Sequence, residues 1–80
     1  MHSLAFAENI LEVVLCEAEK YQKDSIENIE VSLDEHGFME AEEIKFCFGL
    51  LAKGTKAEGA QMEIGLANEN EPPKVTIEMV

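Results

Sequence analysis

Hydrophobic residues recur with helical spacing at the start of the chain. Between Leu4 and Tyr21 the apolar positions are three or four residues apart, as on one face of an α-helix. These positions are Ala7, Ile10, Leu11, Val14, Ala18 and Tyr21. Ser3 is a suitable N-cap, because its hydroxyl can accept a hydrogen bond from a free backbone N–H in the first turn. The pattern therefore predicts a first helix over residues 4–21.

The pattern changes to strict alternation after this helix and then returns to helical spacing. Ile29, Val31 and Leu33 alternate with polar residues, as in a half-buried strand, and Gly37 ends this pattern. A second helix is predicted over residues 40–53. Its apolar face consists of Ile44, Cys47, Phe48 and Leu51. Gly54 suits the position just after the helix, where a left-handed backbone is needed.

Two further alternating runs complete the pattern. Met62, Ile64 and Leu66 predict a second strand, and residues 75–79 predict a third. Residues 68–73 contain two prolines, which favours a turn between these strands. We therefore expect an α/β (α+β) two-layer sandwich with the order α-β-α-β-β. Its three-stranded mixed sheet should carry both helices on one face, with a parallel β-α-β crossover and a closing hairpin.

Length and charge limit the classes of function. The 80 residues suffice for one domain with a thin core, and pairing of two copies would add buried area. Seventeen acidic residues against six basic ones give a net charge of −11, which disfavours binding to nucleic acid or to an anionic membrane surface. No apolar run is long enough to span a membrane. Cys16 and Cys47 fall in apolar helical patterns, which predicts reduced core thiols and a cytoplasmic location.

The first three residues form a candidate metal site. The α-amine of Met1 and the amide nitrogen of His2 can close a five-membered chelate ring, and the imidazole Nδ1 of His2 can add a six-membered ring. The amide of Ser3, a water molecule or a carboxylate could supply a fourth donor. Nitrogen donors that include deprotonated amides favour square-planar Ni(II) or Cu(II). The alternative is that His2 is a solvated side chain without a role.

Other candidate chemistry is weaker. His36, with Asp34, Glu35 and Glu40, could form a mixed nitrogen and oxygen site, but a solvated acidic turn is the better interpretation. Neither cysteine lies in a local signature for nucleophilic catalysis, and the chain has no glycine-rich phosphate-binding loop. The chain is therefore not expected to be an enzyme.

Three stretches are specific in combination: MHSLAFAENILEVVLCEAEK, IKFCFGLLAKGTKAEGAQMEI and VTIEMV. Together they resemble the HypA (also HybF) family of hydrogenase maturation proteins, which are nickel metallochaperones. The resemblance implies that His2 is the main Ni(II) ligand, that Met1 and Ser3 contribute through the backbone, and that Glu40 supplies a carboxylate. It also implies two partners, a nickel-delivery GTPase and the hydrogenase large subunit.

The sequence departs from the family pattern at two places. Residue 3 is Ser3, where the family usually has a glutamate. The family also carries a zinc-binding insert with two Cys-x-x-Cys pairs between the second and third strands. In this chain a short hairpin loop near residues 67–74 replaces that insert, so no structural zinc is expected. Residues 1–80 should therefore form one nickel-binding domain.

Two functions follow from these observations. The first is a cytoplasmic Ni(II)-binding accessory protein for the maturation of nickel enzymes such as hydrogenase. The second is a metal-independent protein-interaction module, a relative of HypA that has lost metal delivery. Such a module would bind through its sheet face or an exposed edge strand.

Overall fold

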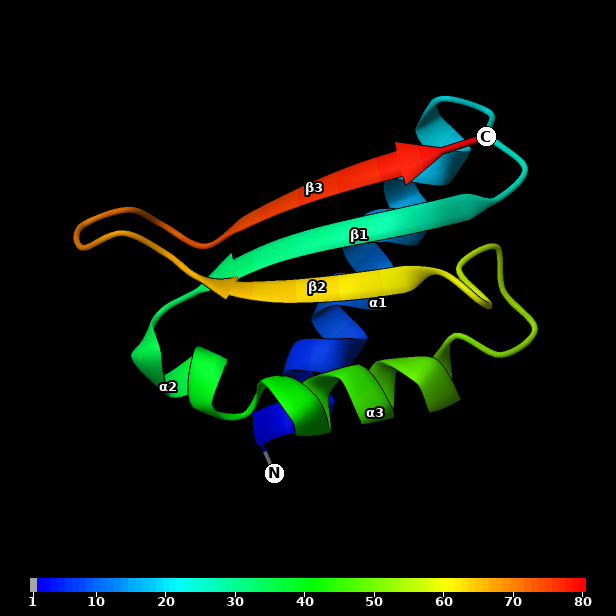
Figure 1. The fold of residues 1–80 in the computed structure, drawn as a ribbon. Coiled ribbons are helices and arrows are strands. Elements are labelled where there is room, and N and C mark those ends of the chain that lie inside the picture. Colours follow the sequence, from blue (N-terminus) through cyan, green and yellow to red (C-terminus); the bar gives the residue numbers. More distant parts are fainter. Residues whose placement is uncertain (1) are drawn as a thin grey trace.

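The computed structural model describes residues 2–80, so Met1 lies outside the described residues. The elements follow one another as α1 (His2–Lys20), β1 (Ile26–Leu33), α2 (Glu35–Met39), α3 (Ala41–Leu51), β2 (Gln61–Leu66) and β3 (Lys74–Met79) (Figure 1). The predicted fold class, an α+β protein with a three-stranded mixed sheet, is confirmed. The short helix α2 was not predicted.

The strands are arranged in the order β2-β1-β3. β1 pairs in parallel with β2, as predicted, and antiparallel with β3. The predicted hairpin between the last two strands is wrong, because β2 and β3 lie on opposite sides of β1. The connecting loop crosses the end of β1, where the N–H of Ala67 donates to the carbonyl of Leu33 at 2.7 Å. β1, at the centre, carries the most fully buried apolar side chains of the three strands.

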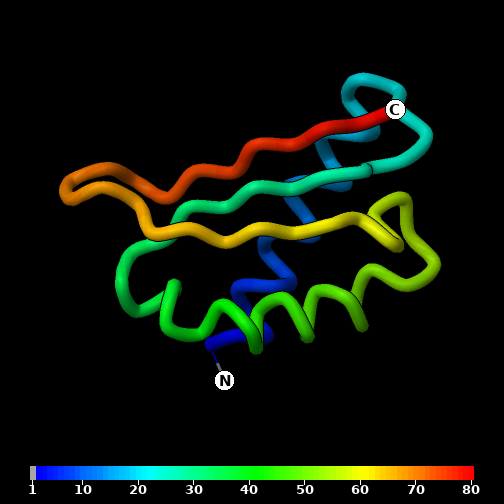
Figure 2. Tube along the Cα trace, viewed as in Figure 1, coloured from blue at the N-terminus to red at the C-terminus, as the bar shows by residue number. Residues whose placement is uncertain are grey.

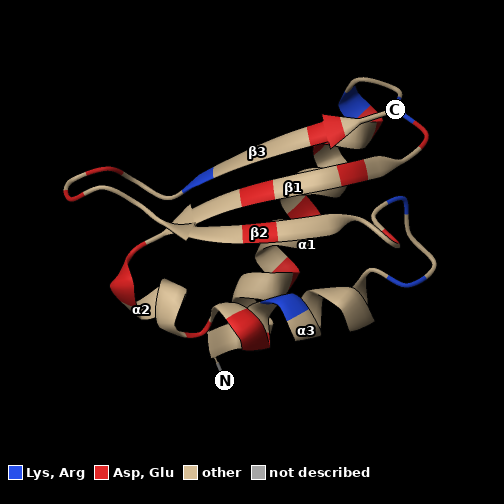
Figure 3. Ribbon diagram, in the orientation of Figure 1, with Lys and Arg blue, Asp and Glu red and all other residues tan. Residues whose placement is uncertain are grey.

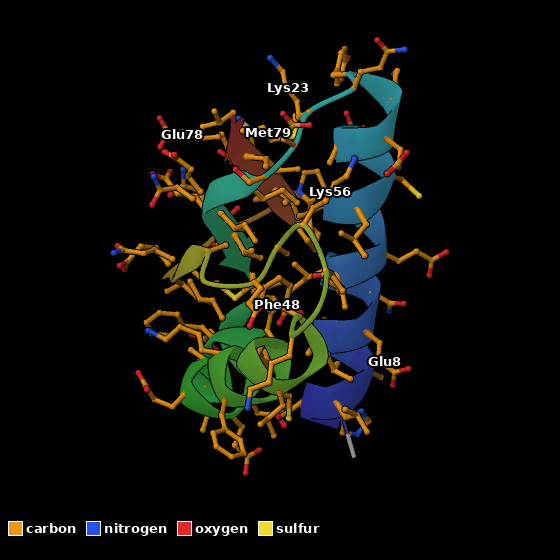
Figure 4. The ribbon with its side chains drawn as sticks, turned by 90° about the vertical axis from the view of Figure 1, so that its right-hand side faces the viewer. Glu8, Lys23, Phe48, Lys56, Glu78 and Met79 are labelled. Carbon is orange, nitrogen blue, oxygen red and sulfur yellow. The ribbon has the colours of Figure 1, made fainter. Side chains whose placement is uncertain are left out.

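A single hydrophobic core lies against one face of the sheet. α1 crosses behind the sheet, and α3 runs alongside β2 and packs against α1 (Figures 1 and 4). Ile29 in β1, Ile44 in α3 and Val14 in α1 are completely buried. The opposite face of the sheet is polar and carries acidic residues on the strands (Figure 3). The alternation read from the sequence thus gives the correct inward face of each strand.

Three local predictions need correction. Ser3 is not an N-cap, because α1 already begins at His2 and Ser3 lies inside its first turn. Tyr21 follows the end of α1 and is exposed. Cys16 is exposed rather than a core thiol, whereas Cys47 is half-buried, and both thiols are free. Gly54 has the expected left-handed backbone, with φ of 79°, although it lies two residues after the C-cap Ala52.

The helix α2 begins at a side-chain cap. Asp34 accepts a hydrogen bond at Oδ1 from the N–H of Gly37 at 2.9 Å. Gly37 is buried against the end of β1, where a Cβ atom would lie 2.9 Å from Cβ of Leu33 and 3.0 Å from its Cδ1. Glycine is required here by the close approach of α2 to Leu33.

A Gly37→Ala variant is therefore expected to lose about 1–3 kcal/mol of unfolding free energy, because its methyl group overpacks the site around Leu33. Urea denaturation followed by circular dichroism measures this loss. Gly49→Ala is the matched control, because a Cβ atom there meets nothing within 4 Å and alanine favours the α3 helix. Equal stability of Gly37→Ala and the wild type would show that α2 can move away from Leu33.

Within residues 2–80 no helix is both long and apolar enough to cross a membrane.

Candidate metal centre

The N-terminal end of α1 lies beside the beginning of α3 (Figure 2). His2 is the first residue of α1 and is exposed to solvent. The N–H groups of the first helical residues, His2 and Ser3 among them, have no acceptor within their own helix. Met1, the third predicted contributor, lies outside the described residues.

The side chain of Ser3 connects the two helices. It is completely buried, although it is a polar group at the end of a helix. Its Oγ lies 2.9 Å from Oε1 of Glu40 and 2.9 Å from Oε2 of Glu43. A hydroxyl group has one hydrogen to donate, so the two carboxylates share a single donor. Two anionic groups are therefore held next to residue 3.

The position of Glu40 follows from the way α3 begins. Glu40 is the N-cap residue of α3, and its side chain makes no capping hydrogen bond to that helix. Its backbone N–H donates to the carbonyl of Gly37 at 3.1 Å, which fixes the corner between α2 and α3. The carboxylate is instead directed to Ser3 of α1.

The electrostatics of this corner favour the two carboxylates. The N-terminus of a helix carries a partial positive charge, and α1 has no acidic residue of its own in the first turn. Glu40 and Glu43 supply negative charge from α3. The same carboxylates increase the attraction of this end of the molecule for a cation.

The structure brings together two of the predicted site residues, Ser3 and Glu40, and adds Glu43, which was not predicted from the sequence. A signal for Glu43 was present: it lies one helical turn after Glu40, so the two side chains share a helix face. The spacing of the buried residues in α1 also extends back to Ser3, four residues before Ala7.

The weaker candidate around His36 does not form a cluster. His36 is exposed on α2, and the carboxylate of Asp34 caps that helix. Over the described residues, no three or more histidine, cysteine, aspartate or glutamate side chains gather in a way that could hold a metal ion. The predicted N-terminal site is of a different kind, because its expected donors include backbone nitrogens.

The sequence matches one family model over residues 1–72, and this model is described as a hydrogenase/urease nickel incorporation metallochaperone, HypA. The match covers most of the chain, which therefore belongs to the HypA family. The family description concerns metal incorporation rather than catalysis, in agreement with the prediction that the chain is not an enzyme.

Curated relatives include three proteins named hydrogenase maturation factor HypA. The protein of Archaeoglobus fulgidus is 39% identical over 66 residues, which cover 82% of this chain and 60% of the relative. The protein of Methanopyrus kandleri is 36% identical and that of Chlorobium phaeobacteroides 34% identical, each over 80% of this chain. The matched residues cover 45% and 57% of these two relatives, so the chain spans about half the length of its relatives.

Proposed function

We propose that this chain binds one Ni(II) ion at its N-terminus and transfers it to other proteins during the maturation of nickel enzymes. The nickel ion is cargo, bound reversibly, and its donors are the α-amine of Met1, the amide nitrogen of His2 and the imidazole of His2. The backbone of Ser3 and the carboxylate of Glu40 complete the donor set.

The contact of Ser3 with Glu40 and Glu43 is the observation that carries this proposal. It supports a cation site because it gathers negative charge beside the backbone nitrogens of the first helical turn. The family usually has a glutamate at residue 3, and here Glu40 and Glu43 provide carboxylates next to that residue instead. Deprotonation of the donors couples nickel affinity to pH, so the ion is held more tightly as the pH rises.

The resemblance to HypA extends the proposal to partners and compartment. We place nickel transfer in the cytoplasm, from this chain to a nickel-delivery GTPase and on to the hydrogenase large subunit. The family description also names urease as a destination of nickel. The alternative of a metal-independent interaction module is not favoured by membership in a family of nickel incorporation proteins.

Titration calorimetry with Ni(II) on untagged protein that starts at Met1 tests the proposal. We expect one ion per chain, and a His2→Ala variant should lose more affinity than the roughly 10–100-fold that removal of an outer-shell partner costs. His36→Ala is the matched control, because His36 is also an exposed histidine but lies on α2. Wild-type protein without nickel binding, or His2→Ala with wild-type affinity, would contradict the proposal.

A further inference from the structure

Within residues 2–80, β3 forms one edge of the sheet, because β1 is its only strand neighbour there (Figure 1). The N–H of Val80 donates to the carbonyl of Ser25 at 2.9 Å, and the carbonyl of Val80 accepts from the N–H of Asp24 at 2.9 Å. Val80 thus directs both backbone groups toward the β1 side. Along an antiparallel strand, the N–H and C=O groups of successive residues point alternately to one side of the strand and to the other. Val75 and Ile77 lie five and three residues before Val80, so their N–H and C=O groups point to the free edge.

A groove runs along this free edge, between β3 and α1, and Glu17 of α1 lies among its mostly apolar lining residues. Its β3 side is formed by Val75, Ile77 and Met79, which are only half-buried. On the α1 side, Val13 is 46% exposed and Tyr21 just beyond the helix is 54% exposed. These partly exposed side chains of β3 and α1 form an apolar margin of the core, next to the backbone groups of β3 that point to the free edge. Such an edge is a suitable surface for an added strand.

The sequence of β3 is complementary to itself in the antiparallel direction. If Thr76 lies opposite Thr76 of a second copy, Lys74 faces Glu78 in both halves of the pair. The same register places Val75 opposite Ile77, the residues whose backbone groups point outward, so both hydrogen bonds of each such pair can form. The charged pairs, the apolar pairs and the direction of the backbone groups therefore all favour the register with Thr76 opposite Thr76.

The two charged side chains that would pair in this register, Lys74 and Glu78, are both exposed on the surface. Lys74 is exposed and forms no ion pair among residues 2–80. Glu78 is exposed, and Oε1 of its carboxylate accepts a hydrogen bond from Nδ2 of Asn28 at 2.9 Å, which leaves the other oxygen for a cation. In contrast, β2 contains no lysine, so no two-fold pairing of β2 places a lysine opposite a glutamate.

We infer that two copies of this chain associate through the free edges of β3, with Thr76 opposite Thr76 and two Lys74–Glu78 pairs between the copies. The two sheets then form one continuous sheet across a two-fold axis. The apolar margin beside α1 is covered by Val75 and Ile77 of the second copy. This interface lies on β3, so the inference does not depend on nickel binding.

Reversing the charge of Lys74 or Glu78 tests this inference, and the measured quantity is the molar mass of the protein in solution. Sedimentation equilibrium over a wide protein concentration range should show a monomer–dimer equilibrium for the wild type. Lys74→Glu and Glu78→Lys should each weaken the dimer about tenfold or more, because each converts both attractive pairs into repulsive ones. The double variant Lys74→Glu/Glu78→Lys should restore it. An equimolar mixture of the two single variants should form heterodimers, because every cross-strand pair is again opposite in charge.

Lys53→Glu is the matched control. It changes the net charge by the same amount as Lys74→Glu but lies at an exposed position after α3. Circular dichroism of each variant confirms that the fold is retained. A wild type that is monomeric at every concentration would overturn the inference. So would a dimer that neither reversal weakens, or one that Lys53→Glu weakens as much as Lys74→Glu.

Discussion

Replacement of Ser3 by glutamate is expected to lower the unfolding free energy by about 3 kcal/mol, which corresponds to about 12–24 °C in melting temperature for a domain of this size. Ser3 is completely buried, and its Oγ contacts the carboxylates of Glu40 and Glu43. A glutamate here is larger than the space available and places a third negative charge beside two others. Thermal unfolding monitored by circular dichroism measures the effect.

Two variants separate the charge effect from the size effect. Ala5→Glu adds the same charge to the same helical turn at an exposed position, so its stability should remain close to that of the wild type. Combining Ser3→Glu with Glu40→Gln and Glu43→Gln should recover the electrostatic part of the loss. If Ser3→Glu is as stable as the wild type, the contacts of Ser3 with the two carboxylates do not hold α1 to α3.

Acetylation of the α-amine of Met1 is expected to abolish high-affinity nickel binding while leaving the fold intact. The acetyl group removes one donor nitrogen and breaks the five-membered ring that it forms with the amide of His2. Native-start protein with Ni(II) should give the yellow colour of a square-planar complex, and the acetylated protein should not. The colour should strengthen as the pH rises past the usual pKa of an α-amine, about 7.7–8.0.

Acetylation is a better test than extension of the chain by one residue. An added residue moves the imidazole to the third position, where an amine, two amides and the imidazole can again surround a planar cation. Circular dichroism of the acetylated protein in the absence of metal serves as the control for folding. Equal nickel affinity with and without the acetyl group would move the site away from the chain start.

The sequence predicted the long helices and all three strands because their apolar periodicity is strong. It did not predict α2, because five residues are too few to show a period and the only local signal is the cap at Asp34. It wrongly paired the last two strands because a short Pro-containing connection favours a hairpin. The expectation of a hairpin considers only strands that are neighbours along the chain. The position of a strand in the sheet also depends on how much apolar surface it can bury. β1 is the longest of the three strands and has a neighbour on each side, and its inward side chains are the most deeply buried.

The candidate site was predictable only in part. Glu40 came from the resemblance to HypA, and the structure shows its carboxylate in contact with Ser3. Serine is common at caps, which favours an N-cap role for Ser3, although its spacing from Ala7 fits the buried stripe of α1. Glu43 was not singled out because an acidic chain offers many carboxylates. Only the packing of α1 against α3 shows which of them meet.

The crossing of the β2–β3 connection over the end of β1 has an evolutionary consequence. Since β2 and β3 share no hydrogen-bonded ladder, the length of the segment between them is uncoupled from strand register. Closing a longer segment costs entropy that grows only slowly with its length. Segments of different length can therefore be gained or lost at this junction while the sheet keeps its strand order.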